Sequence, residues 1–370
     1  MTTESRASGT TLGTDERARR VFAVLTAAAR IADPRDPLGQ EARRVLPDTT
    51  GLSAASVELG LRRHLETQVG AADLERLLSR AGSAPRVHVL LSANVFVGAV
   101  RAVALAVAAA PAVFVRASRR EAVMPHLLRR ALVEAGEPLF ELVDELTPSP
   151  GDEMHVYGRD ETVAALKASC SPGVRVRAHG AGFGIVLLNG AGAADPAVAA
   201  SVSWDVVAFD QRGCLSPRIV VVEGADRTAA HFASTLAKEL DLRNRAVPRG
   251  HRSEDERQAG TLYLRTLQAV GQAEVGSSFV VGFERARRAI LLPPPGRHVH
   301  VVSAYASEHL DKLLRPWASG VTSVGYANRT ADRSSLAKTL RILTPGARWS
   351  PVGSMQTPPL DGPVDLRGVL

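Results

Sequence analysis

The stretch that decides the fold runs from Arg86 to Ser118, RVHVLLSANVFVGAVRAVALAVAAAPAVFVRAS. Its first seven residues are rich in Val and Leu, which predicts a buried strand at 86–92. The Ala- and Val-rich run at 94–110 is long enough for a buried helix, and Pro111 ends it. The run at 112–118 then predicts a second strand. A buried strand, helix and strand in this order indicate a unit of parallel sheet.

The alternation of short apolar strands with helices continues along the chain. We expect further strands at 153–158, 173–180 and 184–190, and helices at 119–136, 159–169 and 195–210. The pattern restarts after Cys214, with strands at 217–224, 277–283, 287–292, 298–304 and 321–327, and helices at 226–242, 253–270 and 308–314. This alternation predicts an α/β fold with two doubly wound domains.

The chain length of 370 residues suits two domains with additional segments. We expect a disordered leader at 1–15 and N-terminal helices at 16–84, where apolar residues recur with helical spacing. A first α/β domain would occupy 85–208, rejoined by a Pro- and Gly-rich tail at 345–370. A second α/β domain would occupy 209–344.

The composition is that of a globular protein, with 45% hydrophobic and 22% charged residues, which excludes a wholly disordered or fibrous chain. A sequence pI near 10.0 and a formal charge of +7 raise the prospect of nucleic-acid binding. However, the 45 basic residues, only four of them lysines, are spread along the chain without a basic run. A coding bias explains that scatter better than a binding footprint does, so we expect no nucleic-acid partner.

Two cysteines, Cys170 and Cys214, occur in a chain whose start is polar and lacks the apolar core of a signal peptide. The longest apolar stretch, 95–115, is interrupted by Arg101 and Pro111, which argues against a membrane-spanning helix. We therefore expect a cytoplasmic protein with reduced thiols and no integral membrane segment.

In open parallel sheets, ligands bind beyond the carboxyl ends of the strands, so the residues there are candidate site residues. Asn94 follows the first strand, where its amide would cap the next helix, the preferred interpretation, or donate to an oxyanion. The second strand ends in a group of basic and hydroxyl residues, Arg116, Ser118, Arg119 and Arg120. These would hold an anionic group, such as a ribose 2′-phosphate, or begin a solvated helix.

Glycines follow the later strands of this domain. Gly158 permits a close backbone approach to a ligand. The turn that contains His179, Gly180 and Gly182 would admit a cofactor, with His179 exchanging a proton, or would simply require a positive φ, the preferred interpretation in isolation. No GxGxxG follows a strand and no GxxxxGK[ST] occurs, so the usual phosphate-binding loops are missing.

The segment FDQRGCLSP at 209–217 places Cys214 between a helix and a strand, at the junction of the two expected domains. Gly213 would let the chain turn tightly, and Arg212 would favour the thiolate form of a nucleophilic cysteine. The alternative is a small buried apolar residue, which is how we interpret Cys170 at the end of an amphipathic helix.

No metal site is expected. The chain has no CxxC, HExxH or carboxylate-rich cluster. His298 and His300 share one face of a predicted strand, but no third ligand accompanies them.

Together these features resemble the aldehyde dehydrogenase superfamily: strands followed by Asn94, by Arg116 and Ser118, and by Gly158, then a Gly-rich turn and, about 35 residues later, a cysteine. Within the superfamily, FDQRGCLSP, SANVFVGAVRA, VRASRRE and the closing VGSMQTPPLDG resemble the acyl-CoA reductases, the family of the bioluminescence fatty-acid reductase. The resemblance runs over residues 85 to 362. The cysteine segment and the MQ-x-PPLDG tail are its most specific parts.

The resemblance implies NADPH-dependent reduction of an acyl thioester to an aldehyde, with acyl-CoA or acyl carrier protein as the donor. Cys214 would take the acyl group, hydride from the nicotinamide would reduce it, and Asn94 would stabilise the oxyanion. Arg116 and Ser118 would hold the adenosine phosphate-ribose, and Gly158 would border the pyrophosphate. The resemblance thus makes 85–208 the expected dinucleotide-binding domain and 209–344 the expected catalytic domain. Superfamily members are usually homo-oligomers, and we expect one here.

Several departures from the family pattern bear on these expectations. Aldehyde-oxidising members use a glutamate in a Glu-Leu-Gly-Gly turn to activate water, whereas this chain has AHGAGFG at 178–184, with His179 near that place. The missing carboxylate argues against hydrolysis to an acid and suits acyl exchange with a thiol. Arg116 stands where a lysine is usual, which leaves NADH open as the cofactor. The Glu-x-Phe-Gly-Pro loop has no clear counterpart, and the N-terminal third matches poorly.

Three other functions are therefore kept as alternatives. The first is an aldehyde dehydrogenase that forms acids, which the missing carboxylate disfavours. The second is a catalytically altered or inactive binding protein on the same fold, which would bind no NADPH and leave Cys214 unreactive. The third is an Arg-driven nucleic-acid binder, which would show a steep salt dependence.

Overall fold

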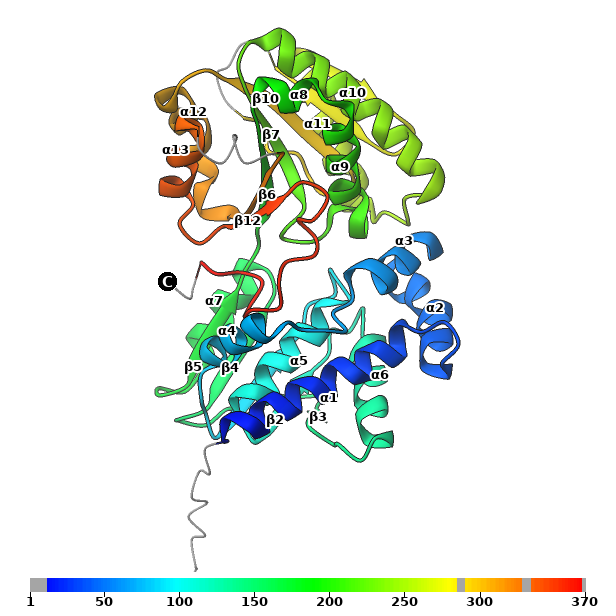
Figure 1. The fold of residues 1–370 in the computed structure, drawn as a ribbon, viewed down its shortest axis with the longest axis vertical. Coiled ribbons are helices and arrows are strands. Elements are labelled where there is room, and N and C mark those ends of the chain that lie inside the picture. Colours follow the sequence, from blue (N-terminus) through cyan, green and yellow to red (C-terminus); the bar gives the residue numbers. More distant parts are fainter. Residues whose placement is uncertain (1–11, 285–289, 328–333, 368–370) are drawn as a thin grey trace, which may run out of the picture. The chain divides into compact units, whose positions relative to one another are not determined.

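The structure, a computed structural model, describes residues 12–284, 290–327 and 334–367 (Figure 1). The chain divides into two compact units, each assembled from segments far apart in the sequence. Unit 1 consists of Met1–Val45, Leu65–Gly180 and Pro359–Pro363, and unit 2 of Leu46–His64, Ala181–Pro358 and Val364–Leu370.

Within the described residues, unit 1 contains a five-stranded parallel sheet in the order β3-β2-β1-β4-β5. Its strands are β1 (Arg86–Leu90), β2 (Ala112–Arg116), β3 (Glu141–Leu142), β4 (Glu153–Tyr157) and β5 (Arg175–His179). Its helices are α1 (Thr14–Ala32), α4 (Ala71–Ala81), α5 (Gly98–Ala109), α6 (Val123–Glu134) and α7 (Asp160–Ser169). Helix α2 (Pro37–Thr50) begins in unit 1 and ends in unit 2.

Helix α5 forms the centre of unit 1, and every residue from Ala99 to Ala109 is buried. Its small Ala and Val side chains let it contact β1, β2, α1 and α4. Arg101 is the one large and charged residue of the helix. It pairs with Glu66 and donates to the Gly362 carbonyl (3.0 Å). The run 94–110 is thus the buried helix that its composition predicted, shortened at its N-terminal end.

The described part of unit 2 contains a seven-stranded sheet in the order β12-β11-β6-β7-β10-β9-β8, parallel except for the β8–β9 pair. Its strands are β6 (Phe183–Leu188), β7 (Pro217–Glu223), β8 (Gln272–Val275), β9 (Val280–Phe283), β10 (His298–Ala304), β11 (Val321–Tyr326) and β12 (Arg348–Pro351). Its helical segments are α3 (Ala54–Leu59), η1 (Gly60–His64), α8 (Gly190–Ala194), α9 (Pro196–Val207), η2 (Ala208–Gln211), α10 (Asp226–Ala246), α11 (Glu254–Val270), α12 (Ser307–Leu314), η3 (Arg315–Gly320) and α13 (Ser335–Leu343).

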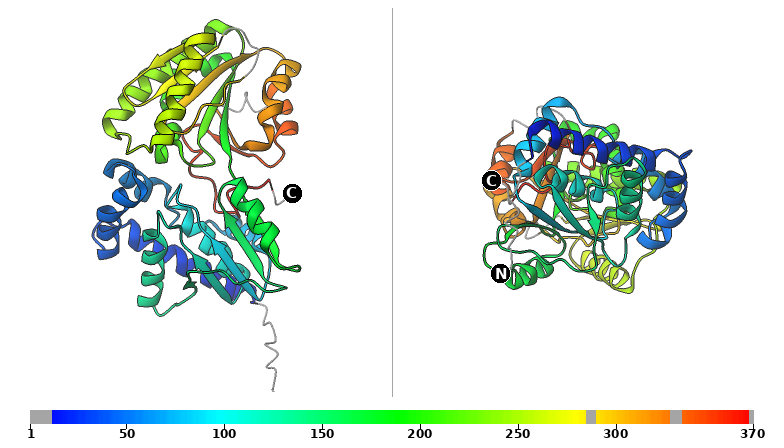
Figure 2. Two further views of the ribbon diagram at one scale, coloured as in Figure 1. Left: turned by 180° about the vertical axis from the view of Figure 1, so that it is seen from behind. Right: turned by 90° about the horizontal axis from the view of Figure 1, so that it is seen from below.

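Both faces of the unit 2 sheet are covered, with α9 and α10 on one side and α12 and α13 on the other (Figures 1 and 2). Alternate residues of β7 divide between the two cores, because successive side chains of a strand point to opposite faces. Val220 packs with Phe232 of α10, whereas Ile219 packs with Leu310 of α12 and Leu336 of α13. The doubly wound α/β fold class is confirmed.

The boundary between the units differs from the one expected at 208/209. Strand β6 pairs with β7 and β11, so residues 181–208 belong to unit 2 and the division falls at 180/181. Each residue of β6 is buried, and a strand that is apolar on both faces carries no mark of the sheet it joins. The tail also differs, because β12 pairs with β11 in unit 2 and only Pro359–Pro363 lie in unit 1.

Some expected segments lie wholly or partly outside the described residues. Helix α1 begins at Thr14, and the rest of the expected leader, residues 1–11, is not described. The strand expected at 287–292 falls partly on 285–289, which are not described, and its remainder has no strand structure. No helix in the described part of the chain is both long and apolar enough to span a bilayer.

Candidate functional site

The carboxyl ends of β2, β1, β4 and β5 lie next to one another in unit 1, since these strands are parallel and neighbours. The strand order changes direction between β1 and β4, and α/β sheets bind ligands at such a switch point. Asn94 follows β1 and Gly158 follows β4, so these two predicted site residues flank the switch point.

Asn94 does not cap the helix that follows it. Helix α5 begins at Gly98, its N-cap residue is Val97, and no side chain caps it. A turn closed by the Gly98 amide and the Val95 carbonyl (3.0 Å) separates Asn94 from the helix. The capping interpretation was therefore wrong. The Asn94 side chain is exposed and makes no hydrogen bond among the described residues, so its amide is available to a ligand.

The basic residues after β2 occupy a loop rather than a helix. Arg116 is half-buried at the end of β2, and the Ser118 hydroxyl accepts a hydrogen bond from the Arg120 amide (3.3 Å). Arg119 and Arg120 are exposed, because α6 begins only at Val123. The loop thus presents two exposed guanidinium groups beside a strand end, as an anion site requires.

Helix α6 begins with a buried acid that the sequence did not single out. The Glu121 carboxylate accepts a hydrogen bond from the Met124 amide (2.9 Å). Burial raises the pKa of this carboxyl group. This hydrogen bond holds the Glu121 carboxylate against the first turn of α6.

Three glycines proposed as cofactor contacts differ in what their own surroundings require. A Cβ at Gly182 would overlap the methyl of the buried Thr322 in unit 2. A Cβ at Gly180 would meet only the carboxylate of Asp160, the end of an exposed side chain that can turn away, and one at Gly158 would meet only the Thr162 side chain, at an ordinary 3.6 Å. Internal packing thus accounts for Gly182 but not for Gly158 or Gly180.

His179 ends β5 and stacks on Tyr157, its register partner on β4, with ring centroids 4.4 Å apart and planes at 15°. Burial raises the pKa of the Tyr157 hydroxyl, which therefore stays protonated. The His155 ring approaches His179 edge-on at 6.4 Å. These contacts fix the plane of the imidazole that the sequence proposed for proton transfer.

The same faces of β4 and β5 carry a buried ionic group that the sequence interpretation missed. Glu153 accepts from His155 (2.9 Å) and pairs with Arg175 (3.2 Å) and with Arg177. The signal was present as polar residues at every second position of EMHVY and RVRAH. The strands at 153–158 and 173–180 were expected because of their apolar residues, and the polar residues between them were not considered.

Cys214 lies in the loop between η2 and β7, is partly buried, and forms no disulfide. Three successive carbonyls of this loop are held by neighbouring strands: Cys214 by the Thr322 hydroxyl, Leu215 by Ser323 Oγ (3.0 Å) and Ser216 by the Gly184 amide (2.8 Å). The loop is therefore fastened to β6 and β11.

Two local features let the loop lie this close. The β6–β11 register shifts between Val321 and Ser323, and such an irregularity redirects the Thr322 side chain. A Cβ at Gly184 would stand 2.5 Å from the Leu215 carbonyl oxygen, so only glycine fits there. None of these partners was predicted, because each depends on strand pairing between segments far apart in the chain.

Gly213 begins the turn that carries the cysteine, because the Ser216 amide donates to the Gly213 carbonyl (3.1 Å), although Gly213 itself has no positive φ. Positive φ angles occur shortly before it, at Phe209 (51°), Asp210 (51°) and Gln211 (64°), all of them buried. A left-handed conformation costs an ordinary L-residue about 1–2 kcal/mol. Three in succession store strain in the chain that leads to Cys214.

Arg212, which was expected to favour a thiolate at Cys214, has its guanidinium paired. Its guanidinium pairs with Glu256 (3.2 Å) and donates to the carbonyls of Thr50 (2.7 Å) and His251 (2.8 Å). Its charge is therefore balanced by a carboxylate within unit 2.

The remaining candidates have structural surroundings. Burial lowers the pKa of both His298 and His300 to about 4, and the Tyr263 hydroxyl lies 3.2 Å from His300 Nδ1. Cys170 lies in an apolar cluster with its Sγ 3.6 Å from Met154 Sδ. Among the described residues, no three His, Cys, Asp or Glu side chains gather as a metal site would require.

The predicted site residues divide between the units. Unit 1 carries Asn94, Arg116, Ser118, Arg119, Gly158, His179 and Gly180, and unit 2 carries Gly182 and Cys214. Within unit 1 the candidates for cofactor binding share one edge of the sheet. Within unit 2 the candidate nucleophile occupies a loop held on several sides.

Comparison with known proteins identifies the family. The profile of the family described as acyl-CoA reductase (LuxC) matches residues 54–367, most of the chain. The chain belongs to the acyl-CoA reductase family. The resemblance drawn from the cysteine segment and the tail is thus confirmed, and it extends into the N-terminal helices, which we had judged poorly matched. No curated protein sequence matches the chain.

Solved structures similar to this acyl-CoA reductase family member share its fold. An oxidoreductase from Marinobacter aquaeolei is 12% identical over 95% of this chain and 80% of its own, with a TM-score of 0.71. A NAD-dependent benzaldehyde dehydrogenase from Corynebacterium glutamicum is 14% identical over 90% and 80%, with a TM-score of 0.66. Lactaldehyde dehydrogenase from Escherichia coli is 13% identical over 91% and 78%, with a TM-score of 0.64. The fold is that of the aldehyde dehydrogenases, and family and fold together indicate an oxidoreductase of aldehyde or acyl groups.

Proposed function

We propose that this protein reduces an acyl thioester to an aldehyde, with Cys214 as the nucleophile and NADPH as the reductant. The observation that carries the proposal is the Cys214 loop of an acyl-CoA reductase family member, held through three carbonyls and preceded by a strained turn. Strained backbone persists where the surroundings hold it, and it clusters at active sites.

In the first step the Cys214 sulfur attacks the carbonyl carbon of the thioester. A carbon–sulfur bond forms to the enzyme, the bond to the donor sulfur breaks, and the donor leaves as a thiol with one proton. A thiolate exchanges readily with a thioester because the bonds formed and broken are alike. When bound, the nicotinamide supplies the hydride that converts the acyl-enzyme to aldehyde and returns the cysteine thiol.

Asn94 is the proposed donor to the oxyanion that forms during acyl transfer. Its side chain is exposed on unit 1 and has no hydrogen-bond partner among the described residues, which fits a group kept for substrate. One positioned donor of this kind contributes about 3 kcal/mol to stabilising the tetrahedral state. His179, with its ring plane fixed by Tyr157, is the proposed proton carrier.

The carboxyl edge of the unit 1 sheet is the proposed cofactor site. Gly158 suits a close approach of the pyrophosphate, since nothing in its own surroundings requires a glycine. Arg116, Ser118 and Arg119 would hold the adenosine ribose. The exposed guanidinium group of Arg119 can pair with a 2′-phosphate, which favours NADPH over NADH. Gly180 and Gly182 are proposed as further cofactor contacts, although packing against the buried Thr322 already requires a glycine at 182.

Steady-state kinetics of Cys214→Ala tests the proposal. We expect acyl-CoA-dependent oxidation of NADPH to fall by at least about four orders of magnitude, as when a catalytic nucleophile is removed. Cys170→Ala, in the apolar cluster, serves as the matched control and should keep its rate. Unchanged activity in Cys214→Ala would show that the acyl group does not pass through this sulfur.

We propose a class of acyl donor and a homo-oligomeric assembly without further detail. Acyl-CoA and acyl carrier protein present the same thioester, and a comparison of kcat/KM for the two separates them. A cytoplasmic location and a homo-oligomer stay predictions, to be checked by fractionation and by light scattering.

A further inference from the structure

The left-handed turn Phe209–Gln211 is the backbone that leads into the Cys214 loop, and its conformation must be held in place. It is buried and contains no glycine. Relaxation of these φ angles to the right-handed region would move the chain that follows. The contacts that prevent relaxation therefore also determine where Cys214 lies.

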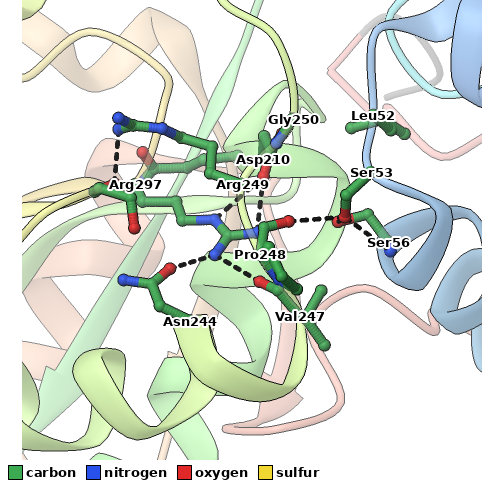
Figure 3. Close-up of polar contacts among 12 residues, drawn as sticks. Leu52, Ser53, Ser56, Asp210, Asn244, Val247, Pro248, Arg249, Gly250 and Arg297 are labelled. Atoms are coloured by element: carbon green, nitrogen blue, oxygen red, sulfur yellow. Dashed lines mark hydrogen bonds and ion pairs between the residues drawn. The ribbon is translucent and has the colours of Figure 1, made fainter.

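A buried ion pair holds the centre of the turn (Figure 3). Asp210 Oδ1 accepts from Arg297 Nε (3.0 Å) and Nη2 (2.7 Å), and Asp210 Oδ2 accepts from the Gly250 amide (2.9 Å). Arg297 is fully buried and itself left-handed, with φ 67°. It also donates to the Val247 carbonyl (2.8 Å) and to the Asn244 side chain.

Gln211 fixes the end of the same turn to two neighbouring strands. Its Nε2 donates to the carbonyls of Pro217 (2.7 Å) and His298 (2.8 Å), and its Oε1 accepts from the His298 amide (2.8 Å). Pro217 begins β7 and His298 begins β10, which pair in the sheet. Every hydrogen-bonding direction of the amide except one acceptor lone pair is used.

The N-terminal segment 46–64 closes the network from outside. Ser53 Oγ donates to the Pro248 carbonyl (2.6 Å), as Figure 3 shows, and the His251 amide donates to the Gly51 carbonyl (2.7 Å). Pro248 lies two residues before Gly250 and His251 one residue after it, and the Gly250 amide binds Asp210. The segment is thus part of the support for the cysteine loop.

We propose that Asp210 and Gln211 are positioning residues for the Cys214 thiol, with Arg297 as the partner through which Asp210 acts. The inference rests on the proposed role of Cys214 as the nucleophile. Misplacing a reacting group by about 1 Å costs on the order of 100-fold in rate, so loss of either contact should act on the acyl-transfer step.

The test separates positioning from mere stabilisation. Asp210→Asn leaves Arg297 buried and unpaired, so it should lower Tm and slow single-turnover acyl transfer to Cys214 by at least about tenfold. The double variant Asp210→Asn with Arg297→Gln removes both charges, so neither is left buried without a partner. We expect it to recover most of the lost Tm while acyl transfer stays slow. Asp241→Asn, which breaks the exposed pair with Arg245 on α10, is the control and should change neither.

Gln211→Glu provides a second readout that does not depend on the ion pair. A carboxylate there faces two carbonyls, whereas a protonated carboxyl can donate to one of them as the amide does. The rate relative to wild type at the same pH should therefore be lower at pH 8 than at pH 6, with KM for acyl-CoA within about twofold of wild type.

Alkylation of Cys214 by iodoacetamide in each variant distinguishes the two proposals, because it needs no acyl chemistry. We expect the alkylation rate to fall with the acyl-transfer rate. Wild-type acyl transfer in Asp210→Asn, or joint recovery of Tm and rate in the double variant, would overturn the positioning role. Failure of the wild type to take an acyl group would instead refute the proposed function, while a changed alkylation rate would still support positioning.

Discussion

The three glycines proposed as cofactor contacts differ in a way that only the structure reveals. The sequence predicted a close approach to a ligand at Gly158 and, in isolation, a turn with positive φ at Gly180 and Gly182, but neither of these two has a positive φ. The buried Thr322 crowds Gly182, whereas Gly158 and Gly180 meet only side chains that leave or can make room. A glycine with no internal reason to be one is the better candidate for contact with a ligand.

Gly158→Ala tests this distinction at the residue scale. The added methyl makes ordinary contacts, so the free energy of unfolding should change by less than about 0.5 kcal/mol, while NADPH affinity falls at least about tenfold. Gly182→Ala is the matched control and should destabilise by about 1–3 kcal/mol through its clash with the buried Thr322. Titration calorimetry and urea unfolding measure the two effects. Unaltered NADPH affinity in Gly158→Ala would remove Gly158 from the cofactor site.

Residue identity singles out Cys214 as a candidate nucleophile, because a cysteine between a helix and a strand within FDQRGCLSP is a local signal. Its support was not predictable. Thr322, Ser323 and Gly184 reach the loop only after β11 and β6 pair with an irregular register. Asn94 shows where local propensity fails: the sequence favoured a helix cap there, but the turn at 95–98 separates Asn94 from the helix.

At the scale of elements, β10 forms the interior of the unit 2 sheet and carries two buried histidines. His298 binds the Pro295 carbonyl through Nδ1 (3.1 Å), and His300 lies beside Tyr263. Burial lowers the pKa of each to about 4, from 6.5. The strand is therefore built for neutral imidazoles, and protonating them opposes folding.

Unit 2 should consequently lose stability in mild acid. Between pH 6.5 and pH 4 the unfolded chain binds protons that folded β10 does not, so the free energy of unfolding falls as pH falls. The slope is about 1.4 kcal/mol per pH unit for each histidine. Urea unfolding of wild type and His300→Leu at pH 7.5, 5.5 and 4.5 measures it. The free energy of unfolding of His300→Leu should fall less steeply with pH than that of wild type. Equal slopes in the two proteins would contradict a neutral, buried His300.

Whether a segment forms a helix or a strand could be predicted best from the sequence. Which sheet a strand joins could be predicted least. Helix α5 and strands β1, β2 and β7 appear where their apolar runs placed them. Strand β6 joined the other sheet, because a run buried on both faces pairs equally well with either. The short β3 has only two residues, too few for a pattern.

At the scale of the whole molecule, the closing segment of the chain contributes to both units in turn. Met355 is buried in unit 2, where Gly184 and Gly325 leave room for its side chain. The Asp205 carboxylate holds this part of the tail by accepting from the Gly353 (2.5 Å) and Met355 (3.0 Å) amides. Met355, the first residue of the MQ-x-PPLDG motif, is therefore held by contacts within unit 2.

Met355→Ala should destabilise the protein by about 2–5 kcal/mol, because it leaves a cavity against two glycines that cannot fill it. Ile342→Ala, on a side chain that is 80% exposed, is the control and should change the free energy of unfolding by less than about 0.5 kcal/mol. Chemical denaturation measures both. Equal stability of the two variants would show that Met355 does not fill the core of unit 2.

The most direct test of the account is peptide mass spectrometry after incubation with acyl-CoA in the absence of NADPH, over a series of chain lengths. We predict one acyl group on Cys214, none on Cys170, and discharge of that group as aldehyde when NADPH is added. The same series would report the acyl chain that the enzyme prefers. An unmodified Cys214 in the wild type, or aldehyde formation by Cys214→Ala, would contradict the account.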